Sequence, residues 1–212
     1  MAVKPILFNT EMVRAILDGR KDATRRIVKG FIPNDAVWGY TAFTPKGYIS
    51  CRGTFADGYG EKFFKLPCEP GNILYVRETW KKAPNGYYYY EDWQKNVIAD
   101  ITKWKPSIHM PKEAARIWLK VTDVRVERLQ DITPKGAESE GVGNLFYDDI
   151  GYGEKNYGTE VDTEYGIAKE QFAWLWESTI KKSDIDRYGW NANPYVWVIE
   201  FERCEKPETK VN

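Results

Sequence analysis

The sequence predicts an α+β protein built on a small, strongly bent β-sheet or β-barrel. Residues 115–129 alternate between apolar and polar side chains over a long run, as a half-buried strand does. Amphipathic helical patterns occur near the start of the chain and again before its last strand. No repeat, low-complexity tract or linker divides the 212 residues, so we expect a single domain.

A strand and a helix open the predicted fold. The short apolar run at 4–9 is bounded by polar residues and predicts a strand. The apolar pattern that follows predicts an amphipathic helix, with Thr10 as its N-cap and Gly19 as its terminator. Lys21 and Thr24 then fall in a loop just beyond this helix.

Turns and short strands fill the middle of the chain. Residues 30–70 are rich in glycine, proline and aromatic residues, and short strands are expected near 38–43, 46–52 and 61–66. A Pro-Gly turn then leads into an alternating strand over 73–79, and the sequence NGYYYYEDW predicts a turn followed by a strand.

The strongest strand signal, residues 115–129, contains one irregularity. Its apolar positions alternate up to Val121 and again from Val124, and the phase slips between them at Thr122 and Asp123. One extra residue in a paired strand has this effect, so we expect a β-bulge there.

Two helices and a strand complete the prediction. Thr133 is a suitable N-cap, and Pro134 a suitable first residue, for a short helix that ends at Gly141. Residues 143–166 are rich in glycine, tyrosine and acidic residues and predict a long insertion or lid. An amphipathic helix over 168–182 precedes the final strand, NPYVWVIEFER.

The composition excludes several classes of site. The basic residues and the acidic residues number 31 each, so no overall field directs the chain to nucleic acid or to a membrane surface. The three cysteines lie far apart, and His109 is the single histidine, so we expect no metal site and no histidine-dependent triad. The chain has no P-loop and no dinucleotide-binding glycine motif, and we expect no cofactor.

The N-terminus lacks the apolar run of a signal peptide, and no apolar segment is long enough to span a bilayer. With reduced cysteines, these features predict a soluble cytoplasmic protein without a membrane partner. Aromatic residues make up 15% of the chain and permit stacking on nucleic-acid bases.

The segment LDGRKDATRR, residues 17–26, gathers cationic side chains around a lysine and a threonine three residues apart, Lys21 and Thr24. Its arginines are Arg20, Arg25 and Arg26. Neighbouring cations and burial lower the pKa of a lysine, which can then act as a general base toward a hydroxyl. Arginines could hold a phosphate or an oxyanion. The alternative is a solvated loop whose arginines pair with Asp18 and Asp22.

Three carboxylates are candidates to complete such a site. Glu138 and Glu140 are two residues apart on the short predicted helix, so they point in different directions and at most one faces a common cleft. Glu78 ends a predicted strand beside Trp80, where it could pair with an arginine or line a pocket.

The chain contains four blocks in a fixed order between residues 4 and 202: KPILFNTEMVRAILDGRKDATRRIVK, GNILYVRETW, SIHMPKEAARIWLKVTDVRVERLQDITPKGAESEGV and NPYVWVIEFE. Together they resemble the ASCH-domain family, and more narrowly its larger members encoded by bacteriophages and prophages. The resemblance implies one ASCH domain over residues 1–212, with a PUA-like β-barrel and helices packed at its rim. Inserted segments are expected near 31–70, 81–105 and 143–190.

One small bacterial branch of this family hydrolyses the acetyl amide of N4-acetylcytidine. Its lysine and threonine lie three residues apart in a GRKTxT-like loop, and they correspond to Lys21 and Thr24. Its glutamate lies in an L-x-x-L-T-x-x-x-A-E-x-E pattern that is similar to LQDITPKGAESE and corresponds to Glu140, with Ile132 at the second leucine. The residue after the lysine is usually threonine and is Asp22 here, and an anion there could pair with Lys21, raise its pKa and weaken it as a base.

The resemblance implies a partner that is RNA, possibly DNA, or a modified nucleoside. In the first hypothesis the chain is an amidohydrolase in which Lys21 activates Thr24, and Glu140 orients Lys21 or shuttles protons to the leaving amine. The residues expected to bind the substrate are Arg20, Arg25, Arg26, Glu78 and Trp80. They would line a cleft between 20–26, the strand end at 73–80 and 133–141.

Two other functions stay open at this point. In a non-catalytic nucleic-acid-binding module, the basic segment would contact phosphates, and Trp80, Tyr88 or Trp93 would stack on bases. In a metal-independent nuclease, the same lysine and arginines would stabilise a phosphoryl transition state.

Overall fold

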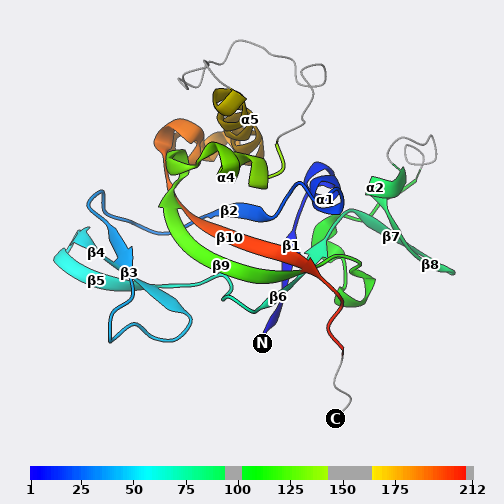
Figure 1. Ribbon diagram of the computed structural model, residues 1–212, viewed down its shortest axis with the longest axis horizontal. Helices are drawn as coiled ribbons and strands as arrows, with labels where there is room; N and C mark the ends of the chain where they lie inside the picture. Colours follow the sequence, from blue (N-terminus) through cyan, green and yellow to red (C-terminus); the bar gives the residue numbers. More distant parts are fainter. Residues whose placement is uncertain (94–101, 143–163, 209–212) are drawn as a thin grey trace.

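A computed structural model describes residues 1–93, 102–142 and 164–208 of the chain (Figure 1). The strands are β1 (Val3–Leu7), β2 (Ala23–Ile27), β3 (Val37–Gly39), β4 (Tyr48–Phe55), β5 (Gly58–Lys65), β6 (Ile73–Arg77), β7 (Trp80–Ala83), β8 (Gly86–Tyr89), β9 (Trp118–Arg128) and β10 (Tyr195–Cys204). The α-helices are α1 (Thr10–Leu17), α2 (Tyr90–Trp93), α4 (Pro134–Ser139), α5 (Glu164–Thr179) and α6 (Ile185–Tyr188). Short 3-10 turns are η1 (Ser107–His109), η2 (Lys112–Ala114), η3 (Leu129–Asp131), η4 (Lys182–Asp184) and η5 (Trp190–Ala192). This mixture of strands and helices confirms the predicted α+β class.

Five strands form the main sheet in the order β1-β6-β9-β10-β2. β1 runs parallel to β6, and the other neighbours are antiparallel. The sheet is strongly curved, most visibly along β9 (Figure 1). β1 and β2 are its two edges, and backbone pairing among the described strands does not close it, so the predicted closed barrel is not found.

The predicted bulge in the long strand is confirmed. Glu200 of β10 pairs with Asp123, and the next residue, Phe201, pairs with Val121, which leaves Thr122 as the extra residue in β9. A bulge of this kind bends the strand and increases its twist. It also explains why the sequence changes phase there while its apolar residues stay on the core side.

β10 separates two hydrophobic cores. Trp197, Ile199 and Phe201 point to one side, into a core that also contains residues of β1, β6, β9 and α1. Val196 and Val198 point to the other side and pack with α4 and α5, which lie together over that face (Figure 1). Each large apolar side chain that is fully buried stabilises the fold by about 1.5–3 kcal/mol. Residues of the neighbouring strand β2 therefore also alternate between these two cores.

Two smaller sheets lie where insertions are predicted. β3, β4 and β5 form a three-stranded sheet within 31–70, and β7 and β8 form a hairpin over 80–89, which overlaps the predicted insertion at 81–105. They extend from opposite ends of the main sheet (Figure 1). Of the third predicted insertion, 143–190, residues 143–163 lie outside the described residues, and the remainder holds α5 and α6.

The first helix begins one residue earlier than the sequence predicts. Asn9 is the N-cap, and its side-chain oxygen accepts a hydrogen bond of 2.8 Å from the Met12 backbone N–H, whereas Thr10 is already helical. Gly19 ends the helix with a positive φ of 75°, as expected. Within the described residues, no helix combines the length and apolar character needed to cross a bilayer.

Candidate active site

The segment predicted as a cationic loop is part of the main sheet. Thr24, Arg25 and Arg26 belong to β2, which pairs with β10 from the far end of the chain. Lys21 precedes this strand and forms a single antiparallel bridge with Glu140, at the end of α4. The loop prediction was wrong because strand formation here depends on this distant partner and not on local preference.

Lys21 and Glu140 form a buried ion pair. The Lys21 ammonium donates to Glu140 Oε2 at 2.7 Å and to the Glu140 backbone oxygen at 2.9 Å. The exposed fraction is 0% for the Lys21 side chain and 3% for that of Glu140. Charged groups are rarely buried this far unless they are paired.

The backbone around α4 explains how Glu140 reaches this position. The Thr133 hydroxyl caps α4 by accepting from the Gly136 N–H at 3.0 Å, as predicted. The helix ends at Ser139 with Glu140 as its C-cap, and Gly141 follows with a φ of 91° that is unfavourable for other residues. A Cβ atom on Gly141 would lie 2.7 Å from that of Ala15, so the glycine also permits the close approach of α4 to α1. Glu140 is thus held at a helix end that packs directly against the Lys21 segment.

Two arginines also contact the end of α4. Arg20 donates to the Gly141 carbonyl at 2.8 Å. Arg25 donates to Glu140 Oε1 at 3.3 Å and lies 3.5 Å from Glu127 Oε2. The Glu140 carboxylate therefore lies between a lysine and an arginine, and Arg25 links it to a second carboxylate.

Arg26 points to the opposite face of β2, because successive strand residues alternate. It donates to the Leu7 carbonyl at 3.0 Å and thereby connects the two edge strands of the main sheet. The Phe8 ring lies 5.3 Å from the Arg26 guanidinium and 5.5 Å from the Lys21 ammonium. We call the region between these edges, formed by Phe8, Lys21, Thr24 and Arg26, the seam.

Thr24 lies on the same face of β2 as Arg26. Its side chain is fully buried, and its hydroxyl has no hydrogen-bond partner. Buried hydroxyl groups nearly always form a hydrogen bond. A buried hydroxyl without one is therefore a candidate for contact with a ligand or for a reactive role. The Thr24 hydroxyl forms no hydrogen bond with Lys21 in this conformation, although both residues belong to the seam.

Burial and the neighbouring charges shift the pKa of Lys21 in opposite directions. Burial lowers the pKa of its ammonium below the ordinary value, and the Arg26 and Arg25 charges lower that pKa further. The Glu140 carboxylate raises it. Burial is the larger effect, so the pKa falls and the neutral amine becomes accessible to chemistry at lower pH than for an exposed lysine.

Asp22 does not form the ion pair with Lys21 that its position next to the lysine suggested. Its side chain is exposed, and Lys21 pairs with Glu140 instead. The Asp22 backbone donates to the Ser139 carbonyl at 3.0 Å and accepts from the Phe201 N–H at 2.8 Å. The expected pair between Asp22 and Lys21 is therefore wrong, because the strand geometry turns the Asp22 side chain to solvent.

Glu78 belongs to a different cluster. Arg116 binds both of its carboxylate oxygens, at 3.0 and 2.9 Å, and also donates to Asp92. Burial raises the pKa of Glu78, and Arg116 opposes this. The first of the two roles suggested by its sequence position, pairing with an arginine, is the one observed.

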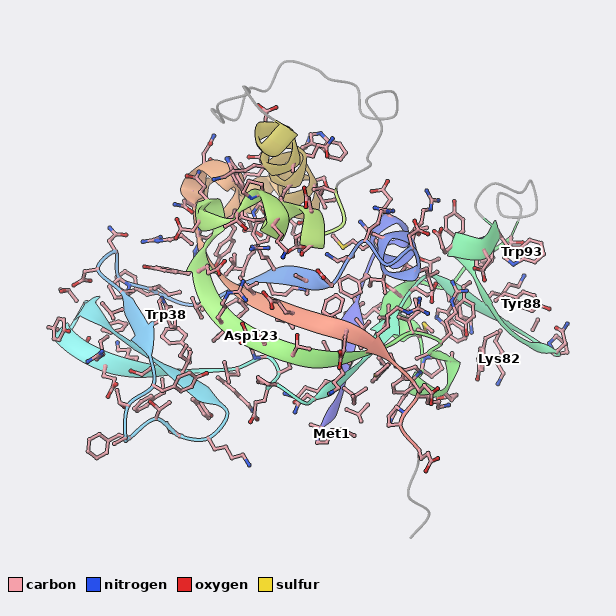
Figure 2. The ribbon with its side chains drawn as sticks, in the orientation of Figure 1. Met1, Trp38, Lys82, Tyr88, Trp93 and Asp123 are labelled. Atoms are coloured by element: carbon pink, nitrogen blue, oxygen red, sulfur yellow. The ribbon has the colours of Figure 1, made fainter. Side chains whose placement is uncertain are left out.

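Trp80 is also outside the seam. It is 4% exposed and packs in a third core with Tyr75 and Trp118. In this conformation the Trp80 ring is too buried to stack on a nucleic-acid base. Tyr88 and Trp93, the other stacking candidates, contact each other edge to face at 6.2 Å beside the β7–β8 hairpin (Figure 2).

Sequence reasoning missed Phe8 and Glu127. Phe8 follows an ordinary apolar strand, and nothing in the local pattern separates it from other core residues. Glu127 occupies a polar position in the 115–129 alternation, which is the one available signal. Both become site residues through strand pairing that joins distant parts of the chain.

Over the described ranges, no three His, Cys, Asp or Glu side chains are grouped as metal ligands would be. Comparison of the chain with protein-family models, with curated proteins and with solved structures finds no significant match. The interpretation of the site therefore rests on its geometry and on the sequence motifs.

Proposed function

We propose that the chain is an ASCH-type protein with a PUA-like fold that removes an acyl group from an N4-acetylcytidine-like base. The observation that carries this proposal is the buried Lys21–Glu140 pair, together with the buried and unpaired hydroxyl of Thr24 three residues further along the chain. The strongly curved sheet with helices at its edge supports the fold assignment, although the sheet stays open between β1 and β2.

Thr24 is the nucleophile in this mechanism. Its oxygen attacks the carbonyl carbon of the acyl amide, and the neutral Lys21 amine accepts the hydroxyl proton. When the amide C–N bond breaks, Lys21 returns the proton to the departing nitrogen of the base. Water then attacks the Thr24 ester while Lys21 accepts its proton. When the ester C–O bond breaks, Lys21 returns this proton to the Thr24 oxygen, which releases the carboxylic acid and restores the neutral amine and the hydroxyl.

Substrate binding requires the seam to open. The Thr24 side chain has no exposed surface and no hydrogen bond to Lys21 in this conformation, so a carbonyl group cannot reach it unless the seam widens. Catalytic hydrogen bonds often shorten only in the substrate complex. The side chains available to move are Phe8 and Arg26, which span the gap between the edge strands.

Glu140 and Arg25 act on Lys21 in opposite ways. The carboxylate orients the amine and stabilises its protonated form after proton transfer, while Arg25 shares the charge of Glu140 and weakens that stabilisation. Arg26 lies on the same strand face as Thr24, so we assign it as the donor that stabilises the oxyanion.

The test is incubation of the protein with N4-acetylcytidine, followed by chromatography for cytidine. We expect turnover by the wild type and a loss of about 10²–10⁴-fold in Lys21→Ala and Thr24→Val. The matched control is Lys120→Ala, which removes a lysine from an exposed ion pair with Glu202. Absence of turnover in the wild type, or equal turnover in Lys21→Ala, would exclude this function.

A further inference from the structure

Exposed aromatic side chains gather on and around the three-stranded sheet β3–β4–β5. Their exposed fractions range from 38% to 82%: Phe31, Tyr40, Phe43, Tyr59 and Phe63. Elsewhere in the described ranges, the exposed large aromatic residue is Trp174, with an exposed fraction of 39%. Exposed apolar groups that cluster in this way mark an interaction surface.

Strand register places several of these side chains on one face. Tyr59 pairs with Thr54, and Phe63, four residues further along β5, pairs with Ser50, so both rings stand on the same side of the sheet. Arg52, Lys65 and Glu61 occupy positions of the same parity and share that side, with Glu61 directly opposite Arg52. We call it the aromatic face. The two rings are about 13 Å apart along β5.

The opposite face of this sheet is covered. A Cβ atom on Gly53 would lie 2.6 Å from the Pro33 ring, so the chain before β3 packs directly on that face. Trp38 extends from β3 toward the main sheet and contacts Phe64 and Tyr195 edge to face, at 5.1 and 5.6 Å (Figure 2). The sheet is thus attached through one face, and the aromatic face is left to solvent.

The acidic residues of this region are engaged within it. Asp35 accepts from the backbone N–H and the hydroxyl of Thr54. Asp57 pairs with Lys62 at 3.4 Å. Glu61 accepts a hydrogen bond from the Ser50 hydroxyl. Of these contacts only that between Asp57 and Lys62 neutralises a charge, because the partners of Asp35 and Glu61 are neutral groups.

The basic residues are distributed differently. Residues 29–65 contain five basic and three acidic side chains, whereas the whole chain is neutral. Arg52, Lys65 and Lys46 are exposed and form no ion pair among the described residues. Cations that form no ion pair, interleaved with exposed rings, match the phosphates and bases of a single nucleic-acid strand.

The loop over 40–47 joins β3 to β4 and carries a further exposed ring. The Thr44 hydroxyl accepts from the Thr41 N–H at 2.8 Å, and the Thr44 N–H donates to the Thr41 carbonyl at 3.0 Å. This small turn is therefore ordered, yet it holds Phe43 82% exposed. An ordered loop that presents a ring to solvent is suited to stacking, because little conformational entropy is lost on binding.

We propose that the aromatic face binds single-stranded nucleic acid, with Tyr59 and Phe63 stacking on bases and Arg52 and Lys65 contacting phosphates. Two copies of this chain would bring the same cations together, which disfavours self-association through this face. The proposal is independent of the chemistry proposed for the seam, because the residues involved are different.

The test measures fluorescence anisotropy of a fluorescein-labelled 12-nucleotide oligo-uridine, and of the matching oligo-thymidine, titrated with the full chain. We expect Tyr59→Ala and Phe63→Ala each to weaken binding about fivefold or more. Arg52→Ala and Lys65→Ala should each reduce the slope of log K against log salt. Trp174→Ala removes an exposed ring outside the sheet and should leave affinity unchanged.

Other outcomes of these experiments distinguish oligonucleotide binding by the aromatic face from hydrolysis at the seam. Equal affinity of the wild type and the Tyr59→Ala/Phe63→Ala double variant would overturn it. So would self-association that this double variant abolishes, seen in sedimentation without oligonucleotide binding. Thr24→Val should bind the oligonucleotide normally, and Tyr59→Ala should hydrolyse the free nucleoside normally, so either proposal can fail alone.

Discussion

Lys21 and Glu140 are 119 residues apart in the sequence, yet their side chains form an ion pair of 2.7 Å with almost no exposed surface. The pair ties the end of α4 to the segment that leads into β2. Backbone contacts reinforce it, because Lys21 forms a β-bridge with Glu140 and donates from its N–H to the Ala15 carbonyl. One contact thus connects the first helix, the edge strand and α4.

An apolar pair would stabilise this position at least as well. Burying two charges costs several kcal/mol each in desolvation, which their attraction recovers only in part. Charged pairs that stay buried despite this cost, with a shifted lysine pKa, are more frequent at functional sites. We therefore expect the pair to have a chemical role in addition to its structural one.

Removing one partner of the pair is expected to destabilise the fold strongly. In Glu140→Ala the Lys21 ammonium stays buried without its carboxylate, and we expect the free energy of unfolding to fall by about 3–5 kcal/mol. Urea denaturation followed by tryptophan fluorescence measures this change. The double variant Lys21→Met/Glu140→Leu should recover much of the loss, because it removes the unpaired ammonium while Arg25 keeps Glu127 as a partner.

The control for this prediction is Glu202→Ala. Glu202 pairs with Lys120 at 3.0 Å, but both side chains are more than half exposed, at 57% and 52%. Removal of an exposed partner changes stability by about 0–1 kcal/mol. Similar costs for Glu140→Ala and Glu202→Ala would show that the pair between Lys21 and Glu140 is solvated in solution.

Thr24→Val should separate stability from function. The Thr24 hydroxyl is buried without a partner, so its replacement by a methyl group removes an uncompensated polar group. We expect the variant to be as stable as the wild type or more stable by about 1 kcal/mol in urea denaturation. A clear loss of stability would indicate that the hydroxyl is hydrogen-bonded in solution, and would remove the structural argument for its reactivity.

Local sequence patterns predicted those elements whose signals are local. The Thr133 cap, the positive φ of Gly19 and the bulge at Thr122 all depend on residues a few positions apart, and the structure contains each of them. The helix start was misplaced by one residue because Asn9 and Thr10 are both suitable caps.

The site was less predictable, because it is assembled from distant segments. The motif identified Lys21 and Glu140, but periodicity gave no indication that Lys21 precedes an edge strand. Asp22 was given the wrong partner because adjacency in sequence does not mean adjacency of side chains on a strand. Phe8 joins the site through the curvature of the whole sheet, which no local pattern records.

Lys21 should make stability depend on pH with a defined sign. Its pKa in the folded state is below the ordinary value of 10.5, mainly because it is buried. Between these two pKa values the unfolded chain binds more protons than the native protein, so the free energy of unfolding rises with pH in that window. Lys21→Met lacks this contribution, and we expect its stability to rise less over the same window.

The comparison with Lys21→Met is needed because the thiols act in the opposite direction. Burial raises the pKa of Cys51 and Cys68 from 9.0 to about 11 in the folded state. Their contribution to stability is therefore lost as the pH rises from 9 to 11. It is common to both proteins and cancels in the difference between urea denaturation curves, and a difference that does not change with pH would contradict the lowered lysine pKa.

Gly141→Ala should be more costly than an equivalent substitution at Gly19. Both glycines follow a helix and have positive φ, 91° and 75° respectively, so alanine costs about 1–2 kcal/mol of backbone strain at either. At Gly19 an added Cβ meets no atom within 4 Å, whereas at Gly141 it would lie 2.7 Å from the Cβ of Ala15. Overpacking of this kind adds about 1–3 kcal/mol. Urea denaturation of the two variants should differ by that amount, and equal costs would mean that α4 does not pack tightly on α1 in solution.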